Sequence, residues 1–204
     1  MLKFSGFFPV PQSSTKFSPA PVPRRALVGK LNRAIGVLRR ASKYVNQATH
    51  VLIHNTLVLP HIDYCSTVWG TSVSEQEIKK LQRLQNCAMR VILECHPRTH
   101  IKDMLDSLRW LDINQRLKYN IACLVWKIKN DQVPEYLKMF TNCSEVHSYN
   151  TRSAHSGDIH QAPCHHMSLK YSGATIWKQL PPELKGSTHS YQSFKKGLIA
   201  YLRG

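Results

Sequence analysis

The chain has 204 residues, the size of one domain or of two small ones, and its 42% hydrophobic content excludes a wholly disordered protein. Its net charge of +16 favours polyanionic partners, first nucleic acid and then an anionic membrane surface. The chain has no run of 18 apolar residues, which excludes a transmembrane helix, and its six cysteines include no CxxC pair. We therefore expect reduced thiols and an intracellular protein, nuclear or cytoplasmic.

Residues 1–26 are predicted to be a flexible, proline-rich leader outside the fold, because five prolines there interrupt any helix. A secretory signal or a mitochondrial presequence fits this segment less well, since its apolar run is short and its prolines are frequent. The excess positive charge lies at both ends of the chain. Residues 1–70 hold nine Lys/Arg and one acid, and residues 151–204 hold seven and two. Basic ends are common in nucleic-acid-binding arms, but they also serve solubility alone.

A first segment, residues 27–70, begins with an amphipathic helix. Apolar residues recur at steps of three and four from Leu27 to Val45, and the helix is expected to start near Arg25. Its opposite arc holds our candidate nucleic-acid-binding residues: Lys30, Arg33, Arg39, Arg40 and Lys43. A solvated outer face would give the same pattern without any ligand.

A second helical stretch, residues 47–69, follows with Asn46 as its N-cap and Pro60 as a break or kink. We expect it to support the first helix, docked through Leu31, Ile35 and Leu38. Asp63 is the lone acid of residues 1–70, and we expect it to act as a cap or as the internal partner of a basic residue.

Residues 71–141 are predicted to form a helical extension. One helix is capped at Ser72 or Ser74 and ends at Pro97, a short one covers 101–108, and a long one runs from Asp112 to about 130. Pro134 should start a one-turn helix. Residues 142–167 are predicted to be an irregular His-rich loop with room for short strands, and residues 168–204 a C-terminal helical pair, 169–179 and 191–203. The expected fold is mainly α, a bundle of about six to eight helices. The four tryptophans sit in apolar patterns and favour core positions over base stacking.

The motifs of catalysis are missing from the sequence. The twelve acids are isolated along the chain, whereas metal-dependent polymerase chemistry needs clustered carboxylates. There is no phosphate-binding glycine loop, and no cofactor is implied. One group could still bind zinc, although its spacing matches no strong zinc signature and His-rich loops are usually solvated: Cys143, His147, His160, Cys164, His165 and His166. A weaker zinc candidate joins Cys95 with His96 and His100.

From Leu31 onward the sequence resembles the C-terminal part of reverse transcriptases from LINE-type (non-LTR) retrotransposons of the jockey-like and chicken-repeat-like groups. The resemblance covers about 170 residues, in the family's order. It rests on the stretches LNRAIGVLRRASKYV, LVLPHIDYCSTVWG, LQRLQNCAMRVIL, LRWLDINQRLKYNIACLVWKI, HSYNTRSA, YSGATIWKQLPPELK and SFKKGLIAYL.

The resemblance implies that residues 31–70 correspond to the polymerase thumb, which lies along a template–primer duplex of RNA and DNA. Fingers, palm and endonuclease are absent from this sequence, so we expect a non-catalytic fragment of an RNA-directed DNA polymerase. It would bind nucleic-acid backbone with little dependence on sequence. A missing palm would leave apolar surface exposed near Ile53, Leu57 and Tyr64.

Three alternatives stay open. The chain could be a structural or protein-interaction remnant of a mobile element that binds no nucleic acid. It could also have no selected function. More weakly, its basic helix could lie on anionic lipid.

Overall fold

The structure is a computed structural model that describes residues 24–143, 158–161, 165, 168–186 and 190–204. In these ranges the protein is mainly helical, which confirms the predicted fold class. Strand pairing among them is limited to an isolated antiparallel bridge between Asn142 and Ile159. The leader up to residue 23 and most of the predicted loop 142–167 lie outside the described residues.

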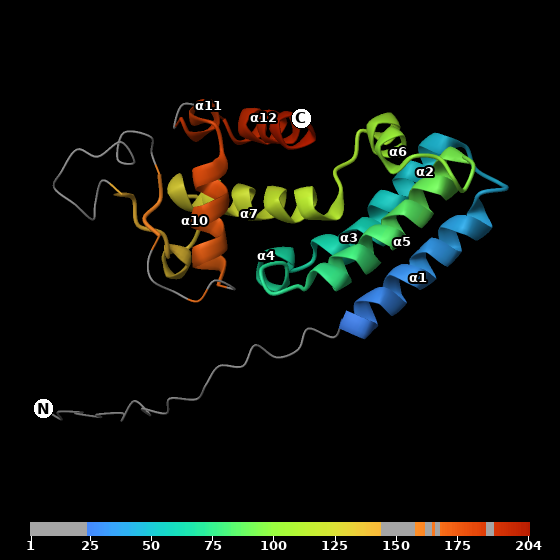
Figure 1. Ribbon diagram of the computed structural model, residues 1–204, viewed down its shortest axis with the longest axis horizontal. Coiled ribbons are helices and arrows are strands. Elements are labelled where there is room, and N and C mark those ends of the chain that lie inside the picture. Colours follow the sequence, from blue (N-terminus) through green and yellow to red (C-terminus); the bar gives the residue numbers. More distant parts are fainter. Residues whose placement is uncertain (1–23, 144–157, 162–164, 166–167, 187–189) are drawn as a thin grey trace, which may run out of the picture.

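The helices form two groups that share one long helix (Figure 1). The first group contains α1 (Arg24–Ala41), α2 (Gln47–Ile53), η1 (His54–Val58), α3 (Leu59–Asp63), α4 (Ser66–Trp69), α5 (Glu75–Leu93) and α6 (Ile101–Leu108). The shared helix is α7 (Ile113–Lys129). The second group contains η2 (Glu135–Leu137), α10 (Leu169–Gln179), α11 (Pro182–Lys185) and α12 (Tyr191–Arg203).

Side-chain caps fix where several helices begin, as the sequence predicts. The Asn46 side chain accepts a hydrogen bond from the Thr49 amide at 2.9 Å and starts α2. Ser74 and Asp112 form capping boxes that start α5 and α7. The ends are less well predicted: α5 ends at Leu93, before the expected stop at Pro97, because Glu94 takes a left-handed conformation (φ 49°). The one-turn helix after Pro134 is a 3₁₀ turn.

Pro60 does not break the second helical stretch. The chain passes it through a π-helical turn, η1, in which the Leu59 amide donates to the His54 carbonyl. A proline lacks the N–H that an α-helix needs, and its ring crowds the carbonyl four residues earlier. The wider π turn accommodates both effects, so α2, η1 and α3 follow one another without a break as one helical rod.

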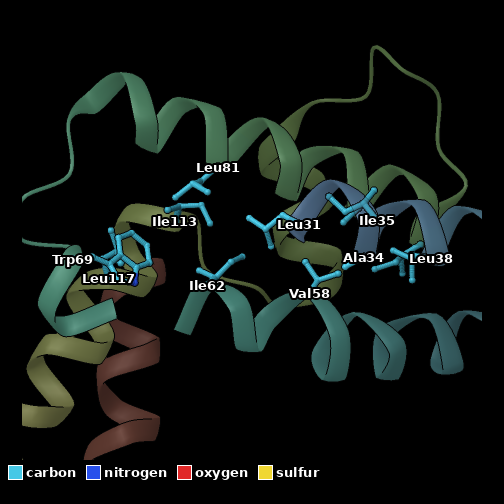
Figure 2. Close-up of a cluster of buried hydrophobic side chains, with 12 residues drawn as sticks. Leu31, Ala34, Ile35, Leu38, Val58, Ile62, Trp69, Leu81, Ile113 and Leu117 are labelled. Carbon is cyan, nitrogen blue, oxygen red and sulfur yellow. The ribbon is translucent and has the colours of Figure 1, made fainter. Parts of the chain in front are cut away.

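The first hydrophobic core lies between α1, this rod and α5 (Figure 2). Leu31, Ile35 and Leu38 are buried there, which confirms the docking face predicted for the first helix. The face contacts α5 as well as the rod, so α1 is covered on two sides. A second core joins the later turns of α7 to α10 and α12, around Trp177, Phe194 and Leu198. Leu117 belongs to the first core and Ile121, one turn further, to the second.

Candidate nucleic-acid interface

Three of the candidate residues form one exposed stripe on α1. Lys30, Arg33 and Arg40 are all exposed, and at 100° per residue they fall within an arc of about 80° on the side away from the buried leucines. At about 1.5 Å per residue the stripe is about 15 Å long. None of the three forms an ion pair with any residue that the structure describes. Their charges therefore face solvent, and no carboxylate in the described part of the chain pairs with them.

The other two candidates lie off this stripe. Arg39 is exposed on the opposite flank of α1, about 100° around the helix from Arg40. Lys43 is exposed too, but α1 ends at Ala41, so this lysine belongs to the turn before α2 and not to the helical face predicted for it. The Ser42 hydroxyl donates to the Arg39 carbonyl at 2.8 Å in this turn. The structure thus divides five predicted residues into a stripe of three and two neighbours.

Asp63 is the internal partner of a basic residue, as predicted. Arg116 of α7 donates two hydrogen bonds to its two carboxylate oxygens, from Nε at 2.7 Å and from Nη2 at 2.6 Å. The Asn120 amide reaches both Asp63 Oδ1, at 3.1 Å, and the buried Ser66 hydroxyl, at 2.8 Å. These bonds tie α7 to the end of α3 and the start of α4. Asp63, the lone acid of residues 1–70, lies far from the α1 stripe in the sequence. It pairs with Arg116 and thereby positions α7.

No three His, Cys, Asp or Glu side chains gather as a possible metal site within the described part of the chain. Of the His-rich candidates, His147, Cys164 and His166 lie outside it, so the predicted zinc group stays a prediction. The weaker candidate residues each have a separate partner. Cys95 contacts the Met104 sulfur at 3.5 Å, and the rings of His96 and His100 accept backbone amides two residues on.

Two buried histidines were not anticipated from the sequence. His50 and His54 are each 1% exposed and lie one turn apart on the rod, and neither Nε2 atom has a hydrogen-bond partner among the described residues. The His54 ring stacks on Trp110, with ring centroids 4.0 Å apart. Burial lowers the pKa of His54 to about 4, with smaller effects from a hydrogen bond to Asn55 and from the Arg116 charge. Both imidazoles act as core residues.

The aromatic predictions are largely confirmed. Trp69, Trp126 and Trp177 are buried, whereas Trp110 is half-buried against His54.

Leu57 and Tyr64 are exposed as expected, at 43% and 77%, while Ile53 is half-buried against the first core.

A basic cluster on the second helical group was not predicted from the sequence. Lys127 of α7 and Lys195 of α12 both lie over the Tyr191 ring, and Lys129 lies over Trp177. The i, i+4 spacing of Tyr191 and Lys195 was the available signal. The contact of Lys127 depends on tertiary packing and left no signal in the sequence.

No helix among the described residues is long and apolar enough to cross a membrane. Their cysteines are all free thiols. Comparison with known proteins identifies no relative: no family model matches the chain, and no curated protein or solved structure matches it significantly.

Proposed function

We propose that the chain is a non-catalytic nucleic-acid-binding module that holds a template–primer duplex of RNA and DNA by its phosphate backbone. It would act as the thumb and adjoining extension of a LINE-type reverse transcriptase, in the nucleus or the cytoplasm. One observation carries the proposal: the exposed stripe of Lys30, Arg33 and Arg40 has no acidic partner among the described residues. The sequence resemblance supports the same assignment independently.

The dimensions of the stripe fit a polynucleotide backbone. Phosphates along one strand advance by about 3.4 Å, so a stripe of about 15 Å faces about four of them. Cations that meet phosphates carry no information about the bases, and binding of this kind is independent of sequence. A polymerase thumb needs such contacts because it must move along every template. The buried face of α1 keeps the stripe rigid, since Leu31 and Leu38 are 1% and 0% exposed.

A salt titration with an RNA–DNA hybrid duplex tests the proposal. With four to five phosphate contacts from α1 and its neighbouring turn, the slope of log K against log salt should be about −4. The double variant Arg33→Gln/Arg40→Gln should reduce its magnitude by about 1.8. A slope near zero for the unmodified protein would reject phosphate binding.

The matched control is Lys79→Gln/Lys102→Gln, which removes the same charge from exposed positions on α5 and α6, outside α1 and its neighbouring turn. We expect the control to change the salt slope by less than half as much as Arg33→Gln/Arg40→Gln does. Equal decreases of the salt slope in the two double variants would mean that only the net charge of the protein matters and that α1 has no specific binding face. A loss confined to particular base sequences would contradict backbone binding.

A second candidate function is protein interaction, and a specific observation favours it. Large apolar side chains are exposed along the stretch from α2 to α4, where Leu52, Leu57, Tyr64 and Val68 are 43% to 77% exposed. Such surface is typical of a partner interface, and we propose the palm of a parent polymerase as the partner. Leu52→Ser/Val68→Ser should improve solubility and leave hybrid binding unchanged. A loss of hybrid binding would place these residues in the nucleic-acid site instead.

A further inference from the structure

Two lysines from different helices share one tyrosine ring. The Nζ of Lys127, near the end of α7, lies 4.9 Å from the centroid of the Tyr191 ring. The Nζ of Lys195, one turn into α12, lies 5.2 Å from the same centroid. The two nitrogens are therefore at most about 10 Å apart. Cation–π attraction to the negative face of the ring holds both lysine stems at this seam.

Among the described residues, no acidic side chain balances this pair. Helices α7 and α12 contain no Asp or Glu between their first and last residues. Neither lysine forms an ion pair with a residue in the described ranges. From Ile113 onward, the described residues hold eleven Lys/Arg and four Asp/Glu, of which Asp131 and Asp158 are paired with lysines of their own.

The polar groups beneath the lysines stay neutral. Cys123 of α7 is a hydrogen-bond partner of both Tyr119 and Tyr191, and burial raises the pKa of its thiol. Burial also raises the pKa of Tyr191 to about 12. No thiolate or phenolate therefore forms near neutral pH to offset the ammonium groups. Two ammonium groups within about 10 Å of each other both gain from an anion that binds beside them.

We propose that Lys127, Tyr191 and Lys195 form a second phosphate-binding site, whose ligand is a phosphodiester group of the bound polynucleotide. The lysines would donate to the non-bridging phosphate oxygens, and the tyrosine ring would position both stems. The identity of the ligand rests on the proposed function, whereas the affinity of the cluster for phosphate does not. Figure 1 shows α12 and α1 at opposite edges of the molecule, so this site and the α1 stripe contact different stretches of backbone.

The experiment compares two double variants on the same two helices. Lys127→Gln/Lys195→Gln removes the site. Lys118→Gln/Lys196→Gln removes the same charge from exposed positions on other faces of α7 and α12. The readouts are the NMR signals of the Tyr191 ring and the salt slope of hybrid-duplex binding. The probes are the duplex and inorganic phosphate, each added separately.

We expect the duplex to shift the Tyr191 signals in the unmodified protein and in the Lys118/Lys196 control, but not in Lys127→Gln/Lys195→Gln. The site variant should lower the magnitude of the salt slope by about 1.8, and the control by less than half of that. Lys127→Arg/Lys195→Arg keeps charge and ring contact, so it should retain the duplex shift, which separates binding from folding.

The proposed site would be overturned if the two Gln variants lowered the salt slope equally. It would also be overturned if the duplex did not shift the Tyr191 signals of the unmodified protein. Saturation by inorganic phosphate at concentrations where the duplex has no effect would overturn the polynucleotide as ligand. A comparison with the α1 variant tests the proposed function separately. If Arg33→Gln/Arg40→Gln binds duplex as the unmodified protein does while Lys127→Gln/Lys195→Gln does not, the α1 proposal fails and this one holds.

Discussion

Acid should destabilise the fold through His54. This imidazole is 1% exposed and its Nε2 has no hydrogen-bond partner in the part of the chain that the structure describes, so a proton there would be a buried charge. Burial, the largest cause, lowers its pKa from 6.5 to about 4 in the folded protein. In the unfolded chain the side chain keeps its ordinary pKa of about 6.5.

The sign and size follow from proton linkage. Because the folded pKa is the lower one, the unfolded chain binds more protons between about pH 6.5 and pH 4, and the free energy of unfolding falls as the pH falls through this window. One pKa unit corresponds to about 1.4 kcal/mol, so the full effect of His54 approaches 3 kcal/mol, roughly, at pH 4. That is a large share of the stability of a typical domain, about 5 to 15 kcal/mol.

The assay is urea denaturation between pH 7.5 and pH 4, followed by tryptophan fluorescence. His54→Phe keeps a ring to stack on Trp110 and cannot be protonated, while His54→Gln keeps a polar group without the titration. Taking differences against these variants cancels the contributions of the other titrating groups. We expect the free energy of unfolding of the unmodified protein, relative to that of His54→Phe, to fall by about 3 kcal/mol from the top to the bottom of this pH window. Parallel curves would refute the reasoning, as would an NMR titration that places the pKa of His54 near 6.5.

Three further predictions concern stability. Asp63→Asn should lower the free energy of unfolding by about 1 to 3 kcal/mol, because it leaves the Arg116 guanidinium partly buried without its carboxylate. A double-mutant cycle with Arg116→Met measures the coupling, and a coupling near zero would show that the pair contributes nothing. Gly29→Ala should stabilise α1 by up to about 1 kcal/mol, since an added Cβ meets nothing within 4 Å. Gly70→Ala should destabilise the protein by about 1 to 3 kcal/mol, since its Cβ would lie 2.5 Å from the Ser66 carbonyl oxygen. Thermal unfolding tests both, and the same sign for the two variants would contradict the packing argument.

Features that depend on local sequence were predicted correctly. The helices over 101–108, 169–179 and 191–203 have the expected bounds. Asn46, Ser74 and Asp112 cap the helices that the sequence assigns to them. These signals are short-range: a cap acts within three residues, and a helical period repeats within seven.

Features that depend on tertiary packing were not predicted. The sequence indicates that Asp63 needs a basic partner, but Arg116 is 53 residues away and nothing local identifies it. His50 and His54 look polar in the sequence, yet tertiary packing buries both, and the His54 ring stacks on Trp110. The candidate nucleic-acid interface was likewise predicted only in part. Periodicity places Lys30, Arg33 and Arg40 on one arc, but the end of α1 at Ala41, which removes Lys43 from that arc, has no clear signal.

The packing of α1 makes its charge pattern a fixed property of the fold. Turning the helix to bring Lys30 or Arg33 inward would move Leu31 and Leu38 out of the core, and exposing a buried leucine costs about 1.5 to 3 kcal/mol. The repulsion among three exposed cations is smaller, because water and salt screen charges that stand several ångströms apart. Burial therefore decides the orientation and the charges follow it. Removing the charges of Arg33 and Arg40 should for this reason leave α1 in place, so a loss of duplex binding in that variant reports on phosphate contact and not on unfolding.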